Sequence, residues 1–173
     1  MNQPQPAQTT NSAPTLDAEV VIEDDRWRLL LDVEKAILEA SACALKIEDL
    51  RSLEGASAIT IVLANNERIA ALNAQFCNKA TPTNVLSFPA DRRATEPGAP
   101  TYLGDVIIAL ETVQREAREQ NVPVLHHVQH LTVHGILHLL GYDHLTDVDA
   151  EAMETQEIQL LASLGIADPY ASQ

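Results

Sequence analysis

One eleven-residue run, HGILHLLGYDH from His134 to His144, constrains this chain more than any other feature. His134 and His138 are four residues apart, so on a helix their side chains share one face and reach a common metal ion. Gly141 favours the left-handed turn that ends a helix, after which His144 returns as a third nitrogen donor. Three imidazoles leave the fourth position of a tetrahedral zinc ion open to water, as in catalytic sites. We therefore predict one zinc ion per chain, at the end of a central helix.

All six histidines of the chain lie between His126 and His144. His130 precedes His134 by one helical turn on the same face, and we expect it to pack or to hydrogen-bond behind the site. His126 and His127 stand at the expected start of the helix, where we expect solvent exposure. Asp143 is either an orienting partner for a ligand histidine or a turn residue, and the sequence leaves both roles open.

The composition excludes several classes of protein. The 173 residues are 46% hydrophobic, which is enough for the core of one domain. Eleven Lys and Arg against 25 Asp and Glu give a net charge of −14, which argues against a general coat for nucleic acid or anionic membranes. From Arg68 to Arg118, six bases against five acids give +1. A local anion-binding surface there and a mixed, solvated surface both remain open.

The sequence also predicts where the protein resides. No apolar run approaches the ~20 residues of a membrane span, and residues 1–14 lack the basic start and apolar stretch of a secretory signal. Two cysteines, Cys43 and Cys77, are too few for a disulfide framework and favour a reducing compartment. We expect a soluble, cytoplasmic protein that does not bind membranes, and the sequence does not indicate its oligomeric state.

Hydrophobic periodicity and turn residues predict an α+β fold, a single domain whose small mixed sheet packs against several helices. Residues 1–16 are expected to be a disordered tail, 17–166 the metal-dependent hydrolase domain and 167–173 a second tail. The expected strands are 20–22, 58–63, 85–88 and 102–109, with a loop over 91–101. The expected helices are 27–44, one capped by Asn65 or Asn66 and running past Phe76, 111–120, 123–141 and 147–164, the last capped by Asp147.

The histidine spacing equals that of the metzincin proteases, H-E-x-x-H-x-x-G-x-x-H. Gly135 stands where those proteases carry their glutamate general base. Peptide hydrolysis lacks its usual base without that carboxylate, so a protease-like hydrolase is only an alternative here.

Three blocks in order resemble the YbeY family of bacterial rRNA-processing endoribonucleases. They are residues 72–89, which include TNVLSFP, residues 103–108 (LGDVII) and the HGILHLLGYDH run, and the likeness covers roughly residues 55–160. The resemblance implies a single-domain α+β fold, one metal ion, usually zinc, on the three histidines, and single-strand-specific RNA cleavage. It also implies roles in small-subunit ribosomal RNA maturation and ribosome quality control, with ribosomal RNA and the ribosome or its proteins as partners.

The chain departs from this family after Leu72-Asn73. The family usually has arginine, glycine and lysine where this chain has Cys77-Asn78-Lys79. That arginine is expected to hold a phosphate at the metal cleft, which a thiol cannot do. Either Lys79, Arg92 or Arg93 binds this phosphate instead, or catalysis is weak. We predict that Lys79 and Arg92 are the phosphate contacts. Cys77 is either a thiol near the metal or a buried packing residue.

We expect a metal-bound water to attack an RNA phosphodiester while the metal stabilises charge on the phosphoryl oxygens. Six aromatic residues do not provide an extended base-stacking platform. A non-catalytic ribosome assembly factor with a structural metal is the alternative that the missing arginine and the acidic charge favour. The last acidic stretch is expected to be a solvated helix face, or else a contact for a basic ribosomal protein: Asp147, Asp149, Glu151, Glu154 and Glu157.

Overall fold

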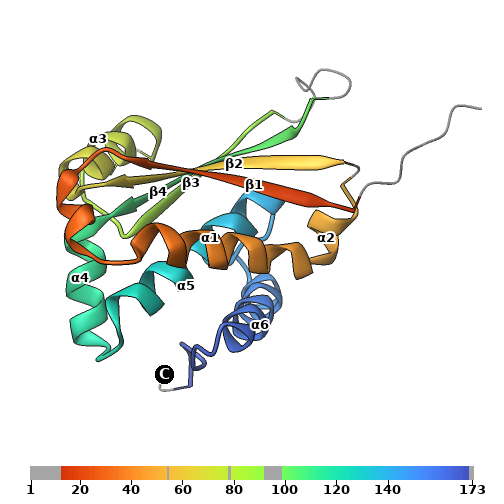
Figure 1. Ribbon diagram of the computed structural model, residues 1–173. Helices are drawn as coiled ribbons and strands as arrows, with labels where there is room; N and C mark the ends of the chain where they lie inside the picture. Colours follow the sequence, from red (N-terminus) through yellow and green to blue (C-terminus); the bar gives the residue numbers. More distant parts are fainter. Residues whose placement is uncertain (1–12, 54, 78, 92–98, 172–173) are drawn as a thin grey trace, which may run out of the picture.

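The computed structural model describes residues 13–53, 55–77, 79–91 and 99–171. In these residues one mixed sheet has the strand order β1-β2-β4-β3 (Figure 1). The strands are β1 (Thr15–Ile22), β2 (Ala56–Ala64), β3 (Val85–Pro89) and β4 (Thr101–Ala109). Strands β1, β2 and β4 are parallel, and β3 pairs antiparallel with β4 at one edge. This confirms the predicted α+β fold with a small mixed sheet.

The longer helices cover the sheet unequally. Helices α1 (Val33–Cys43), α5 (Val124–Leu140) and α6 (Asp147–Ser163) lie on one side of it, and α3 (Asn66–Cys77) lies on the other, over one end (Figure 1). Helix α4 (Leu110–Glu119) links β4 to α5. Three short helical pieces that the sequence did not predict are η1 (Asp25–Leu29), η2 (Ala44–Lys46) and α2 (Glu48–Arg51).

The alternation of buried and partly exposed side chains along β2 explains these layers. Ile59, Ile61 and Leu63 are at most 1% exposed and belong to the main core, which also contains residues of α1 and α5. Thr60, between them, points to the other face and is partly exposed. A period of two places every second side chain on one face of a strand, so the main core lies between the sheet and these helices. This core holds α5 against the sheet beside β3 and β4. The functional residues lie where this helix and β3 meet.

The predicted continuous helix over 27–44 is wrong because the chain is interrupted at residues 30–32, between the 3-10 helix η1 and α1. Trp27 lies in η1 and is fully buried, and its indole Nε1 donates a hydrogen bond to the carbonyl oxygen of Ala64 at 2.7 Å. This anchor holds η1 at the end of β2, and Asp32 then adopts a left-handed conformation (φ 63°) before α1 begins. Tertiary packing of one tryptophan therefore overrides the helical periodicity.

Two other boundaries differ from those predicted. Thr15 and Leu16, placed in the expected tail, belong to β1 because they pair with Ala56 and Ser57 of β2. Helix α6 is capped by Thr146 rather than Asp147, because the Thr146 hydroxyl accepts a hydrogen bond from the Asp149 backbone N–H at 3.2 Å.

Two predicted helix ends are confirmed. The Asn65 carboxamide caps α3, because its Oδ1 accepts the Arg68 backbone N–H at 2.9 Å. Gly141 ends α5. Among the described residues, no helix combines the length and apolarity needed to cross a membrane.

Candidate metal centre and cleft

The C-terminus of α5 is built to reverse the chain. Gly141 has φ 100°, a left-handed conformation that glycine adopts without strain. Its N–H donates to the carbonyl of His138, and the N–H of Tyr142 donates to the carbonyl of Leu137, both at 3.0 Å. These two bonds form a Schellman motif, which satisfies the last carbonyls of the helix. The turn directs the residues after it back over the end of α5, and His144 returns toward His138.

The three predicted metal ligands come together. His134, His138 and His144 each offer a nitrogen, and these nitrogens lie within 4.8 Å of one another. The first two side chains are half-buried and His144 is exposed. Burial, and then the neighbouring imidazoles of His134 and His144, lowers the pKa of His138. The neutral ring, which is the form that binds a metal, is therefore favoured.

Hydrogen bonds behind two of these rings fix their tautomers. His134 Nδ1 lies 2.8 Å from a carboxylate oxygen of Glu157, and His138 Nδ1 lies 3.0 Å from the carbonyl oxygen of Tyr142. Both partners only accept hydrogen bonds, so each Nδ1 carries the proton. The two Nε2 atoms, 3.0 Å apart, then face each other with lone pairs. Two facing acceptors repel unless a cation lies between them, so this donor set fits a metal such as zinc.

Glu157 is a site residue that sequence reasoning missed. It was predicted to be solvated, yet it is only 1% exposed. Burial alone would raise the pKa of its carboxyl, but hydrogen bonds from His130 and His134 outweigh burial and lower it to about 2. The helical period of α6 could have shown that Glu157 is buried, though not what it contacts, because it lies on the same face as the buried Met153 and Leu161.

The two residues expected to support the ligands have different roles. His130 Nε2 lies 2.7 Å from Glu157 Oε2, so His130 shares the carboxylate that holds His134. Asp143 accepts the backbone N–H of His144 at 2.8 Å, as a turn residue does. Among the hydrogen bonds of the described residues, none joins the Asp143 side chain to a ligand imidazole.

An open cleft of about 510 Å³ lies beside the three histidines. Its other wall is formed by β3 and the residues just before it, including Asn84 and Ser87. The Asn84 amide donates to Glu116 Oε2 at 2.9 Å, and its Oδ1 accepts the backbone N–H of Val85 at 2.7 Å. Ser87 Oγ donates to the carbonyl of Gly135 at 3.1 Å, which ties this wall to α5.

Gly135 faces the sheet rather than the cleft. A Cβ added to it would lie 2.4 Å from Val106 Cγ1 and 3.3 Å from Ser87 Oγ. Valine is stiff at χ1 and cannot easily turn away, so a larger residue is excluded unless α5 moves. The absence of a glutamate here is therefore enforced by packing, which weighs against the protease-like alternative.

The predicted phosphate contacts do not lie in the described part of the cleft. Lys79 is exposed and does not line the cleft. Arg92 and Arg93 lie outside the described residues, as does the side chain of Cys77, the last residue of α3.

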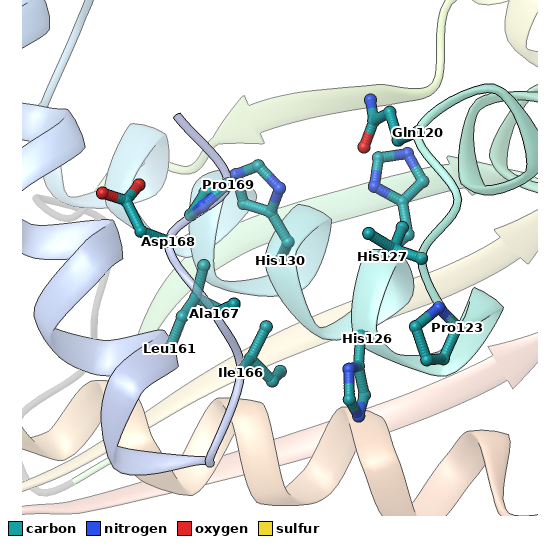
Figure 2. Close-up of a pocket in the computed structure, with 11 residues that line it drawn as sticks. Gln120, Pro123, His126, His127, His130, Leu161, Ile166, Ala167, Asp168 and Pro169 are labelled. Carbon is teal, nitrogen blue, oxygen red and sulfur yellow. The ribbon is translucent and has the colours of Figure 1, made fainter. Parts of the chain in front are cut away.

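A second cavity, of about 400 Å³, lies between the start of α5 and the segment that follows α6 (Figure 2). His127 and His130 line it from α5, and Ile166 and Pro169 line it from the other segment. The prediction that His127 is solvated is wrong: its side chain is only 4% exposed and its Nε2 lies 2.9 Å from Glu116 Oε2. The carboxylate satisfies the buried imidazole and explains its burial.

Comparison with known proteins agrees with the blocks noted in the sequence. Residues 22–165 match the family model described as Endoribonuclease YbeY. A protein of that name from Rhodopseudomonas palustris is 46% identical over 168 residues, covering 96% of this chain and 87% of its own. Another from Cereibacter sphaeroides is 47% identical over 165 residues, covering 88% and 97%.

A solved structure is similar in fold. The solution structure of TM1509 from Thermotoga maritima superposes with a TM-score of 0.54 at 22% identity, covering 85% of this chain and 88% of that one. At this identity the likeness supports the fold alone. The family match and the two relatives go further: this chain belongs to the endoribonuclease YbeY family.

Proposed function

We propose that this chain is a zinc-dependent endoribonuclease that cuts single-stranded RNA in the cytoplasm, in small-subunit ribosomal RNA maturation and ribosome quality control. One observation carries the metal part of this proposal: the Nε2 atoms of His134 and His138 lie 3.0 Å apart beside an open cleft, while the Nδ1 atom of each ring lies within hydrogen-bond distance of an acceptor. Family membership supports RNA as the substrate. Ribosomal RNA, presented by the ribosome or its proteins, is the proposed source, because a chain of charge −14 attracts free RNA weakly.

Each part of the cleft has a proposed role. His134, His138 and His144 hold one zinc ion. When bound, zinc supplies a Lewis acid that activates water and neutralises phosphate charge. Asn84 and Ser87 form the facing wall, where a phosphodiester is positioned. Lys79 and Arg92 are proposed to contact backbone phosphates of the RNA.

The direct test measures zinc content and cleavage of a labelled single-stranded RNA for the wild type and His138→Ala, purified side by side. We expect about one zinc ion per wild-type chain and RNA cleavage, with a folded, zinc-poor and inactive variant. A contaminating ribonuclease would appear in both preparations. Equal cleavage by both proteins, or none by either, would contradict the enzymatic proposal.

The assembly-factor alternative is favoured by Cys77 in the place of the family's arginine and by the acidic charge. Chelation separates the two functions. A structural metal leaves the chain unfolded when EDTA removes it, whereas a catalytic metal leaves a folded and inactive domain. We expect the second result, because the main core is formed by the sheet, α1 and α5 without any contribution from the three histidines. The measurement is far-ultraviolet circular dichroism with and without EDTA.

A further inference from the structure

Glu157 is unusual among the acidic residues of the described chain because it alone is fully buried. Its carboxylate accepts three hydrogen bonds, from His134 Nδ1 at 2.8 Å, His130 Nε2 at 2.7 Å and the Tyr170 hydroxyl at 2.5 Å. No lysine or arginine forms an ion pair with it among the contacts of the described residues, so its polar partners are two imidazoles and a phenol. The carboxylate thus joins two consecutive turns of α5 to a residue beyond the end of α6.

Stability alone does not explain a carboxylate at this position. Removing a carboxylate from water is costly, and well-packed apolar residues often replace buried ionic groups without loss of stability. What only a carboxylate provides here is a strong acceptor for the Nδ1–H of His134. That bond fixes which nitrogen of His134 faces His138 and His144, and it limits rotation of the ring.

Tyr170 brings the segment after α6 into this arrangement. The segment 167–173 was expected to be a tail, but Ala167 and Pro169 line the cavity beside His130 (Figure 2). The Tyr170 ring meets the His130 ring edge-to-face, with centroids 6.0 Å apart. Its hydroxyl shares Glu157 Oε2 with His130, so Tyr170 and His130 together hold the carboxylate in the orientation that His134 requires.

We infer that Glu157 is a positioning residue for the metal ligand His134, and that Tyr170 is a positioning residue for Glu157. This inference rests on the proposed metal-dependent function. It extends the site to a residue 36 positions after His134 and makes the segment after α6 part of its support. Removing either group should therefore weaken zinc binding without removing a ligand.

The test compares wild type, Glu157→Gln, Tyr170→Phe and the control Glu151→Gln. Glu151 lies on the same helix but is exposed, so the control makes the same charge change away from the site. Zinc affinity is measured by competition with a chromogenic chelator. The His134 tautomer is read in the metal-free protein from long-range ¹⁵N–¹H NMR correlations.

We expect Glu157→Gln to lower zinc affinity about 10- to 100-fold, as is typical when the hydrogen-bond partner of a ligand histidine is lost. Tyr170→Phe should lower it less, and Glu151→Gln should match wild type. In the metal-free protein, His134 should carry its proton on Nδ1 in wild type and become a tautomer mixture in Glu157→Gln. A merely structural role for Glu157 would lower the melting temperature but leave both of these readouts unchanged.

The inference is overturned if zinc affinity and the His134 tautomer of Glu157→Gln equal those of Glu151→Gln. If Glu157→Gln does not fold, Tyr170→Phe decides: zinc affinity equal to the control overturns the inference, and lower affinity supports it. A wild-type chain that binds no zinc would overturn the proposed function and this inference together. Wild-type binding with unchanged variants would overturn this inference alone.

Discussion

Helix α5 lies between two carboxylates that differ in what they hold in place. Glu116, from α4, accepts hydrogen bonds from His127 and Asn84, and its side chain is 22% exposed. Glu157, from α6, accepts from two histidines of α5 and is 1% exposed. The imidazole–carboxylate distances, 2.7–2.9 Å, are nearly the same in both groups. Hydrogen-bond length therefore does not separate their functions.

The difference lies on the far side of each imidazole. His134, held by Glu157, directs its other nitrogen at two further histidines. His127, held by Glu116, lines a cavity and is not within ligand distance of them. A carboxylate behind a histidine thus marks a metal ligand only where the second nitrogen converges with others. Because Glu116 also holds Asn84, the two carboxylates support opposite walls of one cleft.

The largest difference between the two carboxylate groups is expected when one histidine is removed from each. We expect His134→Ala to lower zinc affinity by at least about 100-fold and to abolish RNA cleavage, because a ligand is lost. His127→Ala should keep zinc but lose about 1–3 kcal/mol of unfolding free energy, because Glu116 loses a buried partner. Zinc titration and urea denaturation of both variants measure this. An equal loss of zinc affinity in both variants would contradict the assignment of His134 as a metal ligand and His127 as a structural residue.

Acid titration tests how strongly each carboxylate is held. Glu157 has its pKa lowered from 4.5 to about 2, so the stability it contributes is complete above pH 4.5 and is lost as the pH falls toward 2. The advantage of metal-free wild type over Glu157→Gln should be on the order of 3 kcal/mol at neutral pH and shrink across this window. Glu116→Gln should change in the same direction, because burial raises the pKa of Glu116 but hydrogen bonds from His127 and Asn84 outweigh it and lower that pKa. Urea denaturation from pH 7 to 3 measures both, and a pH-independent difference for Glu157→Gln would contradict the assignment.

The wall held by Glu116 is tested through Asn84. We expect Asn84→Ala to lower RNA cleavage about tenfold while zinc affinity stays within about twofold of wild type, because the wall shifts but the ligands do not. In Glu157→Gln we expect the opposite, a larger change in zinc affinity than in RNA cleavage at saturating zinc. Single-turnover cleavage at saturating zinc separates the two. Loss of zinc binding in Asn84→Ala would show that the walls are not independent.

The smallest effect is expected at Lys79, which belongs to neither carboxylate group. As an exposed phosphate contact, Lys79→Ala should weaken RNA binding a few-fold and reduce the slope of log affinity against log salt by about 1. Fluorescence anisotropy at several salt concentrations measures this, with Lys35→Ala on α1 as a matched exposed-lysine control. An unchanged slope would remove Lys79 from the proposed RNA path.

Local signals in the sequence predicted most of the fold. The strand and helix from 102 to 120, the Asn65 cap and the Gly141 helix end each follow from a few neighbouring residues, and the structure agrees within one or two positions. The errors at Trp27 and Thr15 have another cause. Their conformations depend on β2, some 40 residues further along the chain. No local pattern carries that information.

The candidate site shows the same contrast between features set by neighbouring residues and features set by distant contacts. The three histidines converge as their spacing predicts, because one helix and one turn determine their geometry. Glu157 and Tyr170 were missed because they approach the site only through the packing of α6 on α5. His127 was misjudged because burial beside Glu116 depends on the position of α4. Sequence spacing thus located the ligands and pointed to His130 behind them, whereas the contacts that Glu157 and Tyr170 make with them required the tertiary structure.

The contact between α5 and β4 at Gly135 also restricts how this scaffold can evolve. A carboxylate at this position needs a Cβ, and Val106 Cγ1 lies 2.4 Å from where that atom would be. Gly135→Glu alone therefore cannot place a glutamate base at this position, since the helix would first have to move away from the sheet. Two enzyme families can share a histidine spacing and still be separated by a steric barrier that selection cannot cross in one step.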